Sequence, residues 1–173
     1  MIIGFCGYAK AGKDTACTML GLKRMAFADQ LKKDLRMFCI QHYNIDPLEA
    51  TPEEKEIIRP LLVAHGAAMR KVSPNYWVDL LLPENFEPKE DVGITDVRYF
   101  NEAKRICDLG GIVFHILNNR VMACNDEEQN SILEIMARRN SLRHIYVYND
   151  MSLEKFRRNL QEEYEYARAS LAT

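Results

Sequence analysis

One stretch near the N-terminus holds the residues whose types and spacing point most directly to chemistry. It reads Gly7-Tyr8-Ala9-Lys10-Ala11-Gly12-Lys13-Asp14-Thr15 and matches the phosphate-binding template G-x-x-x-x-G-K-[ST] everywhere but at the last position. Glycine at positions 7 and 12 lets the backbone curl so that successive N–H groups point inward, and a helix beginning at Lys13 adds partial positive charge. We therefore predict a loop that binds nucleotide phosphates, with a purely structural glycine turn as the alternative. The residues predicted to contact the nucleotide are Gly7, Lys10, Ala11, Gly12, Lys13, Asp14, Thr15 and Ala16.

Lys13 and Asp14 are the two charged residues of this stretch with a chemical role. Lys13 is predicted to reach the β- and γ-phosphates and to act in catalysis. Where such loops usually place a Ser or Thr hydroxyl on Mg²⁺, this chain has Asp14, whose carboxylate is also a hard oxygen ligand and could hold the ion directly or through water. The alternative is that Asp14 only complements the dipole of the first helical turn. Asp96 follows a buried strand beside the loop and is predicted to act on the same ion, again directly or through water.

The elements needed to position this loop follow from the hydrophobic pattern. Short apolar runs predict strands over residues 1–6, 23–28, 92–96, 112–117 and 145–148. Helical spacing and capping signals predict helices over residues 13–22, 29–43, 61–71, 101–109 and about 127–139, with others starting at Pro52, Ser73 and Ser152. The helix from Pro52 opens with a capping box at Thr51, and Pro60 should end or kink it. Strands alternating with helices imply an α/β fold, with a mostly parallel five-stranded sheet covered on both faces.

Composition narrows the class of protein. The chain has 173 residues with a formal net charge of −2, 47% hydrophobic and 28% charged residues, which suits a single domain and does not favour a nucleic-acid partner. The five cysteines are scattered without a C-x-x-C pair, so a reducing, cytoplasmic location is expected. No apolar run is long enough to span a bilayer, and the first strand leaves no room for a signal peptide, so no membrane association is expected.

Four segments together resemble a known family. GYAKAGKDT, FADQLK (27–32), ITDVRYFNEA (94–103) and YNDMSLEKF (148–156) look like the deoxynucleoside monophosphate kinases of bacteriophages, which carry G-x-x-x-x-G-K-D-T, F-A-D-x-L-K and D-V-R-x-x-N-E-A in this order. The resemblance covers nearly the whole chain. It implies a three-layer P-loop kinase fold, ATP with Mg²⁺ as phosphoryl donor and a deoxynucleoside monophosphate as acceptor, in the host cytoplasm if the protein is phage-encoded. It also makes Asp14 a family trait.

Within that resemblance the chain is predicted to be a single P-loop kinase domain, 1–173. Residues about 29–90 would form an acceptor-binding helical insertion and residues about 118–143 a lid. Asn149 follows the last strand, where it is either a turn residue or approaches the adenine of ATP. Relatives of this kind often pair, and a homodimer through the final helix (Tyr164, Tyr166, Leu171) is an open alternative.

Cations and one aromatic residue are assigned to the acceptor and the lid. The residues predicted to bind the acceptor are Asp29, Lys32, Arg36, Arg70, Trp77 and Arg98. Arg98 comes just after a strand, at the edge where ligands of open α/β sheets bind. Arg138 or Arg139 is predicted to close over the transferring group as a catalytic arginine. Each has a structural alternative: a solvated charge for the Lys and Arg residues, a helix cap for Asp29 and a core position for Trp77. For Asn101 and Glu102 the structural alternative is that they cap the helix that follows Arg98.

Three functions therefore remain open. The first is a kinase that converts deoxynucleoside monophosphates to diphosphates. The second keeps the loop and takes another phosphorylated acceptor, such as dephospho-coenzyme A or a ribonucleoside monophosphate. The third is a nucleotide-binding module without turnover, which would have less need of a cationic lid.

Overall fold

The computed structural model describes residues 1–150 and 152–171, which fall into two compact units. One, the sheet unit, contains Met1–Met25 and the chain from Glu84 onward; the other, the helical unit, is Ala26–Pro83. The segment predicted as a helical insertion, about 29–90, thus overlaps a compact unit of its own. The assignment of the whole chain to a single kinase domain stays a prediction.

The sheet unit is built on five parallel strands. They are β1 (Ile2–Cys6), β2 (Lys23–Met25), β3 (Val92–Val97), β4 (Ile112–Leu117) and β5 (His144–Tyr148), in the order β2-β3-β1-β4-β5. The predicted α/β class with a five-stranded sheet is confirmed, and every pairing is parallel. All five residues of β1 are buried, as expected for a central strand covered on both faces. Because the strands are parallel, the segments that follow β1, β3, β4 and β5 meet at one edge of the sheet.

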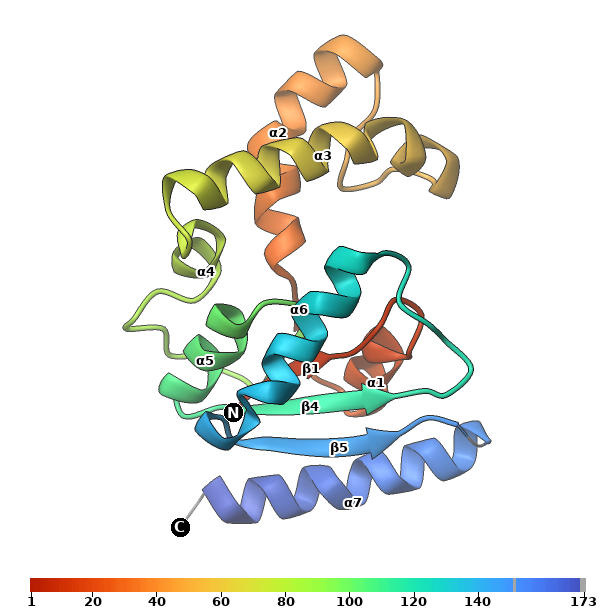
Figure 1. The fold of residues 1–173 in the computed structure, drawn as a ribbon, viewed down its shortest axis with the longest axis vertical. Helices are drawn as coiled ribbons and strands as arrows, with labels where there is room; N and C mark the ends of the chain where they lie inside the picture. Colours follow the sequence, from red (N-terminus) through yellow and green to blue (C-terminus); the bar gives the residue numbers. More distant parts are fainter. Residues whose placement is uncertain (151, 172–173) are drawn as a thin grey trace. The chain divides into compact units, whose positions relative to one another are not determined.

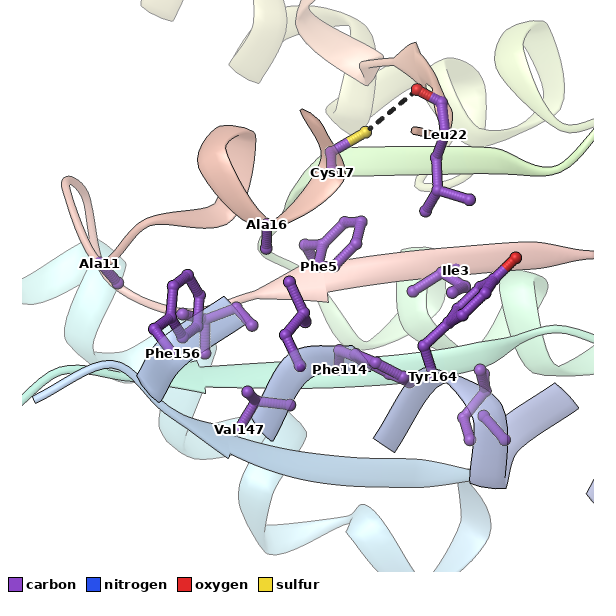
Figure 2. Close-up of a cluster of buried hydrophobic side chains, with 14 residues drawn as sticks. Ile3, Phe5, Ala11, Ala16, Cys17, Leu22, Phe114, Val147, Phe156 and Tyr164 are labelled. Atoms are coloured by element: carbon purple, nitrogen blue, oxygen red, sulfur yellow. Dashed lines mark hydrogen bonds between the residues drawn. The ribbon is translucent and has the colours of Figure 1, made fainter. Parts of the chain in front are cut away.

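Helices cover both faces of this sheet. On one face α1 (Lys13–Met19) and α7 (Leu153–Leu171) pack on alternate strand residues, and Figure 2 shows Ala16, Phe156 and Tyr164 gathered against Ile3, Phe5 and Phe114. On the opposite face lies α5 (Phe100–Asp108): a Cβ added to Gly4 of β1 would meet Ile106 at 2.5 Å. Helix α6 (Asp126–Ala137) lies beside α5 and is followed by the 3₁₀ turn Arg139–Ser141. In Figure 1 helix α7 runs along β5, which forms one border of the sheet.

The helical unit consists of α2 (Phe27–Tyr43), α3 (Pro52–Val72) and α4 (Tyr76–Leu81). The predicted capping box is present, since Glu54 N–H donates to Thr51 Oγ1 while Thr51 N–H donates to the Glu54 carboxylate. The apolar core between the helices is formed by Cys39, Ile45, Ala50 and Ile58, with Leu35, Leu61 and Leu62 beside them.

Several boundaries differ from prediction: the strand predicted over residues 23–28 ends at Met25, where α2 follows, and three further differences have a clear physical cause. The helix end predicted at Pro60 is wrong, because α3 continues across it, while the alternative of a kink stays a prediction. Ile58 and Leu61, on either side of Pro60, pack into one core, which outweighs the missing N–H. Helix α2 begins two residues earlier than predicted, with extended Ala26 as its N-cap. Asp29 is therefore a first-turn residue and not the cap. Helix α1 ends at Met19 because Gly21 takes a left-handed conformation, φ 64°.

None of the helices in the part of the chain that the structure describes is long and apolar enough to cross a membrane.

Two leucines of α7 test the packing of the sheet unit. Leu160 is fully buried against the sheet, whereas Leu153, in the same helix, is 62% exposed. We expect Leu160→Ala to lower the free energy of unfolding by about 2–5 kcal/mol, because it removes buried contacts and leaves a cavity. Leu153→Ala should cost no more than about 0.5 kcal/mol. Urea denaturation followed by circular dichroism measures both; equal losses would contradict this placement of α7.

Candidate functional site

The loop between β1 and α1 reverses direction through backbone conformations that ordinary residues avoid. Gly7 has φ 145°, Lys10 has φ 64° and Gly12 has φ 109°. A Cβ at Gly7 would lie 2.5 Å from the carbonyl oxygen of Ile116, and one at Gly12 would lie 2.4 Å from Asn149 Nδ2. The two glycines of the predicted template are thus required both by their φ values and by close neighbours. The loop thus combines three residues of positive φ with the amino end of α1, a geometry that suits an anion, and its role in binding phosphate stays a prediction.

Lys13 folds back across the start of this loop. Its Nζ donates to the carbonyl oxygens of Gly7, at 2.7 Å, and Tyr8, at 2.8 Å. Burial lowers the pKa of Lys13, and the nearby charge of Arg98 lowers it further, against the opposing effect of Glu128 and Asp14. The ammonium group therefore sits at the loop, where a bound polyphosphate would compete for it with two carbonyls.

Asn149 anchors the other half of the loop. Its Nδ2 donates to Ala11 O at 2.8 Å, and its backbone N–H donates to Leu117 O at 2.7 Å. Within the loop itself, Ala11 N–H donates to Tyr8 O at 3.1 Å. Of the two roles left open by the sequence, the side chain serves the local structure by fixing the loop to the end of β5. An approach to adenine stays a prediction.

The remaining predicted nucleotide contacts lie in or next to α1. Thr15 is exposed, whereas Ala16 is buried in the sheet core and its N–H donates to Gly12 O at 2.8 Å. Helix α1 and helix α7 also flank a groove of about 930 Å³, whose lining includes Asp14, Thr15, Met19, Leu153 and Arg157. Thr15 thus opens onto a groove at the amino end of α1, while Ala16 supports the loop from inside.

Asp14 projects from the first turn of α1. Its side chain is 72% exposed, and Oδ1 accepts a hydrogen bond from Arg24 Nε at 3.1 Å. Partial burial raises the pKa of Asp14, but hydrogen bonds from Thr95 and Arg24 outweigh it, so the net pKa is lowered and the carboxylate is charged. Both the magnesium role and the helix-dipole role fit this position.

The residues around Asp14 fit an ion that arrives with its nucleotide. The described residues contain no group of three His, Cys, Asp or Glu that would form a complete metal site. Mg²⁺ is usually held by one or two carboxylates together with substrate phosphates and water, so a preformed set of three is not needed. Asp96, half-buried near the end of β3, directly follows Thr95, the hydrogen-bond partner of Asp14, but successive side chains of a strand point to opposite faces of the sheet. Asp14 is therefore the residue that would hold the ion, and a role for Asp96 stays a prediction.

Arg98 follows β3 at the same edge of the sheet. Its backbone N–H and that of Tyr99 both donate to Glu102 Oε2, at 2.7 and 3.0 Å. Glu102 therefore caps α5 from inside its first turn, which is the structural alternative. The guanidinium of Arg98 lies close enough to Lys13 to lower its pKa. The structure thus brings Arg98 next to the loop.

Glu128, a buried residue at the start of α6, was missed by the sequence analysis. It is 3% exposed, and its Oε1 accepts from Ala9 N–H, inside the loop, at 3.0 Å. The pattern Asn125-x-x-Glu128 signals a helix start, and Asn125 Oδ1 does accept from Glu128 N–H at 2.8 Å. That signal identifies the helix end and says nothing of the contact with a loop 119 residues away.

The two predicted closing arginines lie elsewhere. Arg138 has its guanidinium 3.4 Å from the centre of the Phe100 ring and donates to Glu134 at 2.9 Å. Arg139 donates to Met136 O at 3.1 Å. Since Arg138 is ten positions after Glu128, it lies about 15 Å farther along the axis of α6. The structure does not bring Arg138 or Arg139 to the loop, and a catalytic role for either stays a prediction.

The other predicted acceptor residues belong to the helical unit. Lys32 pairs with Asp29 at 3.7 Å, and Arg36 donates to Asp46 through Nη2 at 2.6 Å and Nε at 2.9 Å. The Arg36 guanidinium lowers the pKa of Asp46. Two further residues lie beside Gly66: Arg70, and Trp77, which is 4% exposed and donates its indole N–H to Gly66 O at 3.1 Å. For Trp77 the structure has the core position that the sequence left as the alternative.

Comparisons with solved structures give similarities at low sequence identity, among them the following two. TT1252 from Thermus thermophilus is 19% identical, with a TM-score of 0.49 over 99% of this chain and 97% of that one. A dephospho-CoA kinase from Campylobacter jejuni is 15% identical, with a TM-score of 0.48 over 98% of each chain. At these values neither similarity supports a conclusion about this chain. No protein-family model matches the sequence, and no curated protein matches it.

Gly12 and Gly21 both have positive φ, so comparing a substitution at each distinguishes an effect on the loop from a general effect of backbone strain. Gly12→Ala would force a Cβ against Asn149, whereas nothing lies within 4 Å of a Cβ at Gly21. We expect Gly12→Ala to weaken binding of inorganic tripolyphosphate on the order of tenfold or more, because the loop must shift. Gly21→Ala should cost about 1–2 kcal/mol of stability through its φ and leave binding unchanged. Isothermal titration calorimetry distinguishes them, and equal binding by both variants would show that the loop is not the phosphate site.

Proposed function

We propose that this protein is an ATP-dependent kinase that phosphorylates deoxynucleoside monophosphates to diphosphates. The observation that carries the proposal is the loop of residues 7–13, whose left-handed backbone at Gly7, Lys10 and Gly12 forms a nest closed by Lys13. Nests of this kind at a helix amino end suit phosphate groups. The resemblance of four sequence segments to the phage kinases supports the choice of acceptor.

Phosphoryl transfer between two nucleotides asks the protein for positioning and charge neutralisation more than for a nucleophile. The backbone N–H groups of the loop hold the donor phosphates in place. Lys13 exchanges the carbonyls of Gly7 and Tyr8 for phosphate oxygens, and Arg98 adds a second positive charge. Mg²⁺, when bound, neutralises phosphate charge, and Asp14 is the residue proposed to hold it, with Asp96 assisting. A phosphate oxygen of the acceptor then attacks the γ-phosphorus of ATP, the bond from that phosphorus to the β,γ-bridging oxygen breaks, and ADP leaves, with no covalent enzyme intermediate.

The acceptor is proposed to use cations of the helical unit. Lys32, Arg36 and Arg70 are the candidates: Lys32 pairs with Asp29, Arg36 donates to Asp46, and Arg70 lies beside Gly66. To bind the acceptor, Arg36 would have to give up its hydrogen bonds to the Asp46 carboxylate and form hydrogen bonds to a phosphate group, both of which are charge-assisted. Arg138 or Arg139 remains the proposed closing arginine, and either would need α6 or its own side chain to move.

A coupled assay of ADP release tests the function directly. With a panel of deoxy- and ribonucleoside monophosphates and dephospho-coenzyme A, we expect acceptor-dependent ADP with the deoxynucleotides. Lys13→Met should abolish turnover, because it removes the ammonium group that meets the phosphates, while circular dichroism shows a folded chain. Lys23→Met, on an exposed lysine that pairs with Glu90, is the matched control and should keep full activity. A ribonucleotide or dephospho-coenzyme A preference would contradict the proposed acceptor, and no acceptor-dependent ADP would leave only a binding module.

The role of Asp14 is tested through the magnesium titration of this activity. We expect Asp14→Ala to shift half-saturation to higher Mg²⁺ by about tenfold, because one charged oxygen ligand is lost. Glu53→Ala, which removes an exposed acid from the first turn of α3, controls for the helix-dipole effect and should leave the titration unchanged. An unchanged titration for Asp14→Ala would leave Asp14 as a helix-end residue.

A further inference from the structure

A buried carboxylate next to a phosphate-binding loop needs a reason, since a negative charge there opposes an incoming polyphosphate. Glu128 is such a group. Its Oε1 accepts from Ala9 N–H at 3.0 Å, and its Oε2 accepts from Cys124 N–H at 2.8 Å. Both oxygens are thus held by backbone, and the side chain is only 2% exposed. Because all these residues belong to the sheet unit, the arrangement is internal to it.

Glu128 is charged despite its burial. Burial alone raises the pKa of its carboxyl group, but hydrogen bonds from Cys124 and Ala9 and the charge of Arg98 outweigh that effect, and the net pKa is lowered. Arg98 Nη2 lies 3.9 Å from Glu128 Oε1, with the arginine side chain half exposed. The carboxylate therefore lies between a loop N–H and the guanidinium that follows β3.

This placement also bears on Lys13. Arg98 and Lys13 are two positive charges close enough for the first to lower the pKa of the second, while Glu128 acts in the opposite direction. Without an anion between them, two such cations repel each other, and a long arginine side chain would turn toward solvent. A fixed carboxylate beside them offsets that repulsion.

We propose that Glu128 is a positioning residue that holds the guanidinium of Arg98 at the mouth of the phosphate loop. Its carboxylate accepts a hydrogen bond from Ala9 N–H, which holds the loop, and attracts the guanidinium of Arg98. Both groups are therefore in position before a polyphosphate binds. The inference rests on the phosphate-binding part of the proposed function and is independent of the acceptor. It makes Arg98, rather than an arginine of the segment 118–143, the pre-set partner of the loop.

Two roles for Glu128 predict opposite effects on binding. If Glu128 were only a negative charge near the loop, its removal would strengthen the binding of a polyanion. If it positions Arg98, its removal would weaken binding, because the guanidinium is released to solvent. If Glu128 only held Ala9, its removal would weaken polyanion binding by the same factor whether or not Arg98 is present.

The test is a double-mutant cycle on binding of inorganic tripolyphosphate, measured by isothermal titration calorimetry. Glu128→Gln loses the charge and keeps one oxygen that can accept from Ala9 N–H, while its NH2 group replaces the oxygen that accepts from Cys124 N–H, so circular dichroism must show an unchanged fold. We expect it to weaken binding about fivefold to tenfold, and Arg98→Ala to weaken it about tenfold. In the double variant, Glu128→Gln should add no further loss to that of Arg98→Ala. Glu127→Gln, an exposed acid next in sequence that accepts from Tyr99 Oη at 2.6 Å, is the matched control and should stay within about twofold of the wild type.

A shorter acid covers the case in which a buried glutamine disturbs the fold. Glu128→Asp keeps the charge and withdraws the carboxylate, so positioning predicts a loss of about fivefold with the fold monitored by circular dichroism. Tighter or unchanged binding in Glu128→Gln, unchanged binding in Glu128→Asp, or a full additional loss in the Arg98→Ala background would each overturn the inference. Binding is measured without an acceptor, so a missing kinase activity leaves a positive result standing. Absence of tripolyphosphate binding by the wild type overturns both proposals.

Discussion

The reversal of the chain between β1 and α1 is the constraint on which the candidate site depends. Left-handed backbone at Gly7, Lys10 and Gly12 turns the chain within a few residues of a buried strand. Neighbours press on it from two sides, the Ile116 carbonyl of β4 and the Asn149 side chain after β5. The shape of the loop is therefore determined by its contacts with the ends of the neighbouring strands as well as by its own glycines.

Charges at this edge are arranged around the same reversal. Lys13 satisfies two carbonyls of the loop, and Asn149 a third, so the turn keeps its shape through groups that each have a partner. Arg98 brings a second cation, and the buried Glu128 compensates it while holding a loop N–H. A chain with a formal net charge of −2 thus has two cations, Lys13 and Arg98, beside the loop, together with the carboxylates of Glu128 and Asp14. This local arrangement of charges, and not the net charge, is what a polyphosphate would encounter.

Much of this arrangement follows from local sequence. The strands are short apolar runs, and the loop template and the capping box at Thr51 depend on neighbours a few residues apart, so their positions could be predicted. Pro60 could not, because its effect on α3 is set by whether both halves of the helix share a core, which depends on tertiary packing. The prediction of Arg138 or Arg139 as the closing arginine rests on charge and segment alone. Both follow the end of α6, so their positions depend on where that helix begins and ends, and the structure puts Arg138 on the ring of Phe100.

Glu128 shows why sites resist prediction more than folds do. An acid three residues after an N-cap asparagine has an ordinary use as a first-turn charge, and nothing local distinguishes it from its neighbour Glu127. What separates the two is which side of α6 packs on the rest of the sheet unit: Glu128 faces the loop and is buried, and Glu127 is exposed. That difference is one step of about 100° around a helix, fixed by the apolar residues Ile132 and Ile135 that bury the same side. The burial of Ile132 and Ile135 therefore fixes the rotation of α6 about its axis. The same rotation determines that Glu128, and not Glu127, contacts the loop.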